Sequence, residues 1–335
     1  MYEVREEPLG YTKDNLIDVV PLGQPYAIMI DPSGACNFKC CFCPCNNADE
    51  NKTNRHTVMS FDMFTTIVDG LTQFPGKVPV IDLYGLGEPL LNRNFVRMVK
   101  YLKSKNVCNM IRTTTNGSLL TKTLIDDLVD SGIDYVKISI EGLSAGDYKE
   151  LCDVAIDYDE LIENIRYLYE KSRGKLEIGT KIISSAFSSH EDRQRYLDLF
   201  SPITDYTYIR NVQTNWAEFD NLVIPEGTED GKYCNNKVPP YDVCSYPLTH
   251  MLVHSNGDIG LCCYDWKHET AYANIAQMSV PEAWTSKELQ AIRLAHLTGK
   301  RGTLPYCRSC IRKGYDNIDA VAPQIAAIIE GEHHE

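Results

Sequence analysis

The stretch YAIMIDPSGACNFKCCFCP, residues 26–44, joins a short apolar run to three cysteines spaced C-x3-C-x2-C. The run is predicted to be a strand, and it leads directly into Cys36, Cys40 and Cys43. Three thiolates on one tight loop can bind three irons of a [4Fe–4S] cube, whereas such cubes usually take four cysteines. The fourth iron would then be open to the donor atoms of a small molecule.

Zinc is the competing metal for this loop. A zinc site more often pairs two C-x2-C elements and closes its ligand shell, which this loop does not do. Two further cysteines, Cys41 and Cys45, lie within the same stretch and are interpreted as non-ligands.

Cysteines are unusually frequent in this chain, which has 13 of them. Five lie between residues 36 and 45, three are isolated, and the second group is Cys244, Cys262, Cys263, Cys307 and Cys310. Reducing compartments disfavour structural disulfides, so clustered cysteines there are more often metal ligands or catalytic groups. Two groups so far apart predict two metal centres.

The composition narrows the class of protein. A chain of 335 residues can form one large domain, or one large and one small. Its net charge of −13 argues against nucleic acid or an anionic membrane as the main partner. No apolar run is long enough to span a membrane, and the N-terminus lacks the features of a signal peptide. We therefore expect a cytoplasmic protein.

Short strands alternate with amphipathic segments on both sides of the cysteine loop. Strands are predicted at 26–31, 78–85, 109–117, 135–142, 175–184 and 205–211, and helices at 60–74, 93–105, 121–131, 159–172 and 190–200. Helices of this length between strands require crossovers, so the strands should be parallel. The pattern predicts an α/β fold, an open or partial barrel, with its active site at the C-terminal ends of the strands.

The pattern changes after residue 211. Residues 212–243 are rich in Asn, Pro, Gly and acids, and we interpret them as a linker with substrate-site loops. A β-hairpin over 250–263 and helices over 279–297 and 318–330 are predicted to follow. The predicted division is an extension over 1–25, a barrel over 26–211, this linker, and a small domain over 244–335.

The C-x3-C-x2-C loop, with Phe42 just before its last cysteine, resembles the motif of the radical S-adenosylmethionine (SAM) superfamily. The resemblance implies a partial (β/α)6 barrel, with SAM bound to the open iron through its amino and carboxylate groups. It also implies an external one-electron donor, such as flavodoxin or ferredoxin. Reductive cleavage of SAM would give a 5′-deoxyadenosyl radical that takes a hydrogen atom from the substrate.

A second motif follows the second predicted strand. Gly85, Gly87, Glu88 and Pro89 resemble the family's Gly-Gly-Glu-Pro turn, with Leu86 in place of one glycine. Backbone carbonyls near the glycines would accept from the SAM ammonium, and Glu88 would be its charge partner. The alternative is a turn that exposes an ordinary glutamate.

Other strand ends match the family's cofactor contacts less sharply. Thr115 and Asn116 end the third strand, and Ser139 and Glu141 resemble a Ser-x-Asp pair on the fourth. Glu141 is one methylene longer than the family's aspartate, so its contact would differ. Arg210, at the end of the sixth strand, faces the same rim and is a candidate catalytic residue. The alternative role for each is packing at a strand end.

The second cysteine group resembles a SPASM domain in a shorter, twitch-like form. Cys244, Gly257 and Cys262 have the spacing of its opening, C-x9-15-G-x4-C. The resemblance implies one auxiliary [4Fe–4S] cluster, making two in the chain, with the ligands Cys244, Cys262, Cys307 and Cys310. Structural zinc is the alternative. Cys263 would point to the opposite face of a strand from its neighbour, so only one of the two could be a ligand.

The chemistry after hydrogen abstraction has several possible outcomes. An electron passed to the auxiliary cluster would give oxidation, whereas a hydrogen atom from Cys263 or Cys234 would give epimerisation. The alternative role for Cys263 is that of a small buried side chain, and the alternative for Cys234 is that of an ordinary loop thiol.

The shorter auxiliary region favours a carbohydrate-type small molecule as the substrate. A ribosomally made peptide is the alternative substrate, although about 25 residues before the barrel are too few for a dedicated leader-binding domain. An electron carrier or a zinc-stabilised module is the non-enzymatic alternative.

Overall fold

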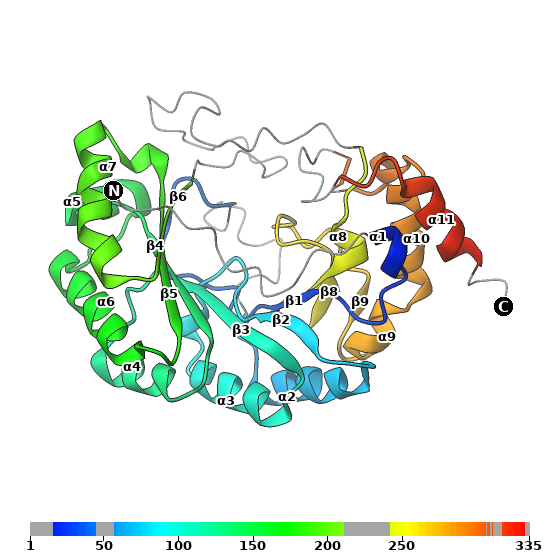
Figure 1. Ribbon diagram of the computed structural model, residues 1–335, viewed down its shortest axis with the longest axis horizontal. Coiled ribbons are helices and arrows are strands. Elements are labelled where there is room, and N and C mark those ends of the chain that lie inside the picture. Colours follow the sequence, from blue (N-terminus) through cyan, green and yellow to red (C-terminus); the bar gives the residue numbers. More distant parts are fainter. Residues whose placement is uncertain are drawn as a thin grey trace.

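One continuous sheet organises the part of the chain that the structure describes. The structure is a computed structural model that describes residues 16–44, 57–210, 242–305, 307, 308, 310 and 317–331. The sheet has nine strands in the order β6-β5-β4-β3-β2-β1-β7-β8-β9. In Figure 1 it is curved, with the helices between its first six strands on its outer side.

The first six strands form the predicted partial barrel. They are β1 (Ala27–Ile30), β2 (Val78–Asp82), β3 (Cys108–Thr115), β4 (Tyr135–Ile140), β5 (Glu177–Ile183) and β6 (Tyr206–Arg210). Each pairs in parallel with the next one along the chain. The parallel (β/α)6 arrangement is therefore confirmed, and the C-terminal ends of its strands share one edge.

The crossover helices are α2 (Phe61–Gly70), α3 (Phe95–Lys105), α4 (Lys122–Val129), α5 (Ala145–Cys152), α6 (Tyr158–Ser172) and α7 (His190–Phe200). Most begin at a side-chain cap. Ser60, Thr121 and Ser189, for example, each accept a hydrogen bond from the backbone N–H three residues on. The apolar faces of these helices pack on the sheet and form the main core.

Two helix predictions were wrong. Helix α5 was missed, because it is short and contains Gly146, although Ser144 caps it. The single helix expected over 279–297 is in fact two, α9 (Val280–Trp284) and α10 (Lys287–Leu297). The break occurs because Ser286 starts a new helix by accepting from the backbone N–H of Leu289.

The C-terminal region extends the barrel sheet. Strand β7 (His250–Val253) pairs in parallel with β1, on the side away from β2. Strands β8 (Asp258–Gly260) and β9 (Ala273–Asn274) continue the sheet in antiparallel fashion. Gly257, in the β7–β8 turn, has φ +90°, a conformation that favours glycine. The region that carries the second cysteine group is thus built onto the same sheet as the first.

A second, smaller core lies beyond this extension. It packs α1 (Leu16–Val19), α8 (Tyr246–Thr249), α10 and α11 (Ala322–Gly331) through apolar side chains such as Leu297 and Ile325. Among the described helices, none is long and apolar enough to cross a membrane.

Candidate cluster and cofactor sites

The first cysteine loop leaves the C-terminal end of β1 and is anchored on the end of α5. The backbone N–H of Lys39 donates to the carbonyl of Cys152 (2.9 Å), and that of Cys41 donates to the carbonyl of Leu151 (2.8 Å). Phe38, the residue before Lys39, is buried with its ring against that of Tyr148 on α5. The helix that the sequence did not reveal therefore supplies the acceptors that fix this loop.

The three motif thiols lie close enough to influence one another. Protein atoms packed around the Cys36 thiol, with the charges of Glu88 and Cys43, raise the pKa of this thiol to about 12, although the residue is exposed as a whole. A hydrogen bond with Cys152, whose sulfur is 3.4 Å away, and burial raise the pKa of Cys40. Cys43 adds to that rise. A raised pKa favours the protonated thiol, whereas a cysteine binds metal as the thiolate. Cluster iron bound at this loop would supply the positive charge that stabilises the thiolates.

Glu88 is a buried link between the ends of β2 and β3. Its carboxylate accepts from the Thr115 hydroxyl (2.6 Å) and from the backbone N–H groups of Asn116 (2.7 Å) and Leu90 (3.0 Å). Burial raises its pKa to about 6, and these hydrogen bonds oppose the rise. Glu88 is thus not an ordinary exposed side chain. Its carboxylate positions the turn, and its contact with the SAM ammonium stays a prediction.

Asn116 joins this link to the cysteine loop. Its side chain forms a hydrogen bond with the Cys36 thiol, and its Nδ2–H donates to the side-chain oxygen Oδ1 of Asn37 (2.9 Å). Asn37 in turn donates to the hydroxyl of Ser118 (2.9 Å). The roles of Asn37 and Ser118 were missed in the sequence analysis. The two residues are 81 positions apart, and nothing near either of them indicates that they meet.

The glycines of the β2 turn allow the turn to approach the cysteine loop. A β-carbon on Gly87 would lie 2.1 Å from the carbonyl oxygen of Ser33 and 2.4 Å from that of Ala35. A β-carbon on Gly85 would lie 2.4 Å from Asp31 Cγ. Pro89 is buried and begins a 3-10 helix. Close backbone packing is therefore a sufficient reason for both glycines, whether or not their carbonyls contact SAM.

Gly87→Ala is expected to lower the free energy of unfolding by about 3 kcal/mol, because the atoms it would meet are backbone atoms that cannot rotate away. It should also lower iron loading at the first site. Urea unfolding of the metal-free protein and an iron assay would measure both effects. Gly146→Ala is the matched control, since a β-carbon there meets only Ser144 Oγ at 3.5 Å. A native-like stability for Gly87→Ala would contradict the packing argument.

The remaining predicted cofactor residues also lie at strand ends. Ser139 and Glu141 are buried at the end of β4, and Glu141 Oε2 has no hydrogen-bond partner among the described residues. Burial raises the Glu141 pKa. Phe42 is half-buried in the cysteine loop, and the Arg210 guanidinium lies 5.7 Å from the Tyr208 ring. An orphaned buried oxygen at the active-site edge fits a ligand that offers a hydrogen-bond donor.

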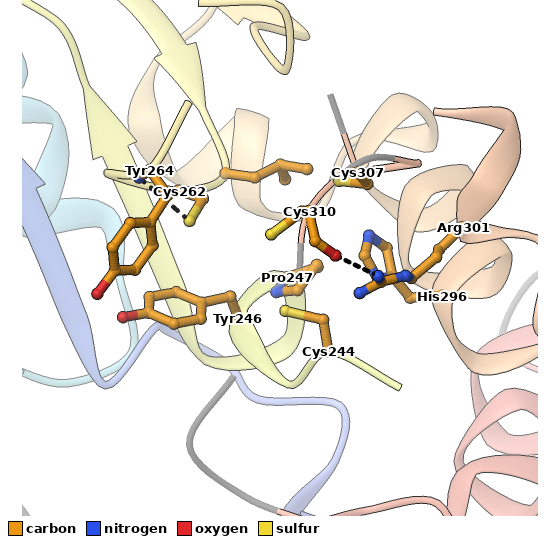
Figure 2. Close-up of a pocket in the computed structure, with 10 residues that line it drawn as sticks. Cys244, Tyr246, Pro247, Cys262, Tyr264, His296, Arg301, Cys307 and Cys310 are labelled. Atoms are coloured by element: carbon orange, nitrogen blue, oxygen red, sulfur yellow. Dashed lines mark hydrogen bonds between the residues drawn. The ribbon is translucent and has the colours of Figure 1, made fainter. Parts of the chain in front are cut away.

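The second cysteine group surrounds a pocket. Figure 2 shows its four predicted ligands around one space, and they come from before α8, after β8 and after α10. The four are Cys244, Cys262, Cys307 and Cys310. Burial raises the pKa of Cys244 and of Cys307 to about 12. The fold therefore gathers thiols that are more than 60 residues apart, as the predicted auxiliary site requires.

The expectation that Cys263 points to the opposite face of a strand from Cys262 was wrong. Strand β8 ends at Gly260, so the alternation of side chains along a strand does not extend to Cys262 and Cys263. Instead the two side chains are hydrogen-bonded, and this bond is the main reason that the pKa of Cys262 is raised. Only Cys262 lines the pocket. The other candidate hydrogen donor, Cys234, lies outside the described residues.

The spacing of the thiols bears on the kind of metal. A zinc ion needs four ligand atoms about 2.0–2.3 Å from one point. Within the described ranges, no three His, Cys, Asp or Glu side chains are placed to hold a single ion. The family match reported below is what assigns this pocket to an iron–sulfur cluster rather than to zinc.

The comparisons with known proteins agree with this geometry. Residues 30–183 match the Radical SAM superfamily, and residues 244–311 match SPASM, an iron–sulfur cluster-binding domain. The chain is therefore a radical SAM enzyme of the SPASM type. Its cofactors are [4Fe–4S] clusters and SAM.

Individual relatives are distant. A tungsten-containing aldehyde ferredoxin oxidoreductase cofactor-modifying protein of Pyrococcus furiosus is 21% identical, over 84% of this chain and 86% of the relative. The structure of BtrN in complex with AdoMet and 2-DOIA has a TM-score of 0.54 and 17% identity, covering 88% of this chain and 98% of BtrN. Streptococcus suis SuiB bound to precursor peptide SuiA has a TM-score of 0.62 and 18% identity, covering 82% and 67%. At these identities the solved structures show the fold alone.

Proposed function

We propose that this radical SAM enzyme dehydrogenates or epimerises a carbohydrate-type small molecule, and that dehydrogenation is the better supported of the two. The observation that carries the choice is the second cysteine pocket, whose four thiols suffice for a cluster with no open iron. Such a cluster suits electron transfer better than binding a second SAM. The bond between Cys263 and Cys262 leaves Cys263 poorly placed to donate a hydrogen atom to substrate.

In this proposal Cys36, Cys40 and Cys43 hold the first cluster, and Cys244, Cys262, Cys307 and Cys310 hold the second. When bound, the first cluster and SAM supply reductive cleavage of the sulfonium and a carbon-centred radical that abstracts hydrogen.

The other residues of the first site orient its ligands. Glu88, Thr115 and Asn116 fix the β2 turn beside the cysteine loop. Glu141 Oε2, which has no partner among the described residues, would accept a hydrogen bond from SAM, and Ser139 lies on the same strand end. Arg210 ends β6 at the same edge of the sheet, where it would contact the substrate.

We also infer a one-electron donor such as a flavodoxin or ferredoxin, and a cytoplasmic location. Two sets of thiol ligands that must stay reduced before cluster assembly support a reducing compartment.

A peptide is the second candidate substrate. The similarity to SuiB, which was solved with a bound precursor peptide, favours it. The similarity to BtrN, which was solved with AdoMet and 2-DOIA, covers nearly the whole BtrN chain and favours the small molecule.

The test is to follow deuterium from substrate into 5′-deoxyadenosine. Reduced anaerobic enzyme is incubated with SAM and a panel of sugars and aminocyclitols deuterated at their carbinol carbons, and products are analysed by mass spectrometry. We expect deuterium in 5′-deoxyadenosine and a product that has lost one deuterium from carbon and one hydrogen from oxygen, as a dehydrogenation requires. A product that has exchanged one carbon-bound deuterium for one hydrogen from the unlabelled solvent would instead indicate epimerisation. Deuterium transfer only from a labelled peptide would refute the carbohydrate proposal.

A further inference from the structure

His296, on α10, is a buried side chain with nothing to bond in the described part of the chain. It is 3% exposed and lines the second cysteine pocket, and neither of its ring nitrogens has a partner there. Burial, and then the charge of Arg301, lower its pKa to about 4. An imidazole carries at least one N–H in either protonation state, and burying that donor without an acceptor is unfavourable. The pocket must therefore offer it an acceptor.

A cation lies beside this histidine. Arg301 also lines the pocket, and its Nη2 donates to the carbonyl oxygen of Cys310 at 2.6 Å. Its charge opposes the effect of burial on the pKa of Cys244 and Cys307, so the guanidinium lies within electrostatic reach of both thiols. In Figure 2 Arg301 and His296 lie together on one side of the thiols, while Tyr246 and Tyr264 lie on the other.

The charges around the pocket have one sign. Among its lining residues, as far as the structure describes them, Arg301 has the only side chain that is charged at neutral pH, and none is a carboxylate. Asp265 lies near enough to raise the Cys307 pKa slightly, but its carboxylate accepts from the backbone N–H groups of Glu269 and Thr270. The pocket thus presents a hydrogen-bond donor and a cation to whatever the thiols hold.

We propose that His296 donates its N–H to a sulfur atom of the auxiliary cluster, and that His296 and Arg301 together raise the reduction potential of that cluster. The inference rests on the proposed function, which places a cluster between these four cysteines. Reduction adds one negative charge to a cluster, so a hydrogen bond to sulfur and a nearby cation both stabilise the reduced form. His296 and Arg301 are positioning residues that suit the auxiliary cluster to accept an electron, as dehydrogenation of the substrate requires.

The experiment isolates the auxiliary cluster. In full-length protein carrying Cys36→Ala, Cys40→Ala and Cys43→Ala, a potentiometric titration followed by electron paramagnetic resonance reports this cluster alone. We expect His296→Leu to shift the midpoint potential to a more negative value, and His296→Gln, which keeps an N–H donor, to lie closer to the parent. Arg301→Gln should also shift it negatively, and Arg301→Lys less so.

His254→Leu is the matched control. His254 is equally buried with an unpartnered Nε2, but it does not line the pocket, so its removal should leave the potential unchanged. A midpoint potential in His296→Leu equal to that of the parent, with iron retained, would overturn the inference. Loss of iron from both His296→Leu and His296→Gln would also overturn it, because His296 would then be a ligand. A parent without iron would instead refute the second cluster itself, and the proposed function with it.

A spectroscopic measurement keeps the test decisive if His296→Leu does not fold. The reduced parent labelled with ¹⁵N-histidine should show a weak hyperfine coupling from one ring nitrogen, as expected across a hydrogen bond. The coupling should disappear in His296→Gln. The absence of any ¹⁵N coupling in the parent would overturn the proposal.

Discussion

Replacing Cys36, Cys40 and Cys43 together by alanine is expected to lower the iron content of reconstituted protein from about eight to about four atoms per chain. The expectation follows from two separate sets of thiols, one after β1 and the other around the pocket between β8 and α10. Iron and acid-labile sulfide, assayed after anaerobic reconstitution, measure it. Cys108→Ala, which removes an isolated cysteine on β3, is the control and should keep about eight irons.

Two results would contradict this account in different ways. A triple variant without iron would show that the second cysteine group holds no cluster. A triple variant that keeps about eight irons would show that other thiols replace the motif. Cys41 and Cys152, the latter with its sulfur 3.4 Å from that of Cys40, would then be the first positions to change.

Replacing Cys244, Cys307 and Cys310 by alanine is expected to separate cleavage of SAM from oxidation of the substrate. The first site shares no residue with this pocket, so cleavage should persist within about tenfold of the native rate. Oxidised product should fall to background, because the substrate radical loses its electron acceptor. Both products are measured by mass spectrometry in the same incubation. Thermal unfolding monitors the fold, since the pocket adjoins the smaller core around α10 and α11.

Full oxidation by a variant that holds only about four irons would show that the auxiliary cluster is not the electron acceptor. Loss of both SAM cleavage and substrate oxidation, with a native-like thermal transition, would show that SAM cleavage at the first site depends on the second site. Either result would remove the main support for dehydrogenation.

Local features of the chain were predictable from the sequence. The cysteine spacing after 26–31 predicted a cluster-binding loop because all three predicted ligands lie within eight residues. The alternation of strands and helices identified the barrel because each βα unit carries its own pattern. Gly87 was flagged by its motif, and the structure supplies the physical reason, the approach of two backbones.

What the sequence could not show are contacts between distant segments. Strand β7 pairs with β1 across more than 200 residues, and nothing in either strand indicates its partner. The bond between Asn37 and Ser118, and the position of His296 beside cysteines of other elements, depend on the same tertiary arrangement. The relative orientation of Cys262 and Cys263 was mispredicted because β8 ends at Gly260, before either cysteine, so strand alternation does not apply to them.

The most direct test of the central claim is whether the reconstituted, anaerobically reduced protein cleaves SAM. We predict methionine and 5′-deoxyadenosine in equal amounts, formed only with reductant, and neither product from the Cys36→Ala/Cys40→Ala/Cys43→Ala variant. SAM that remains intact with protein holding about eight irons would contradict the account, because the chain would then be an iron–sulfur carrier rather than a radical enzyme.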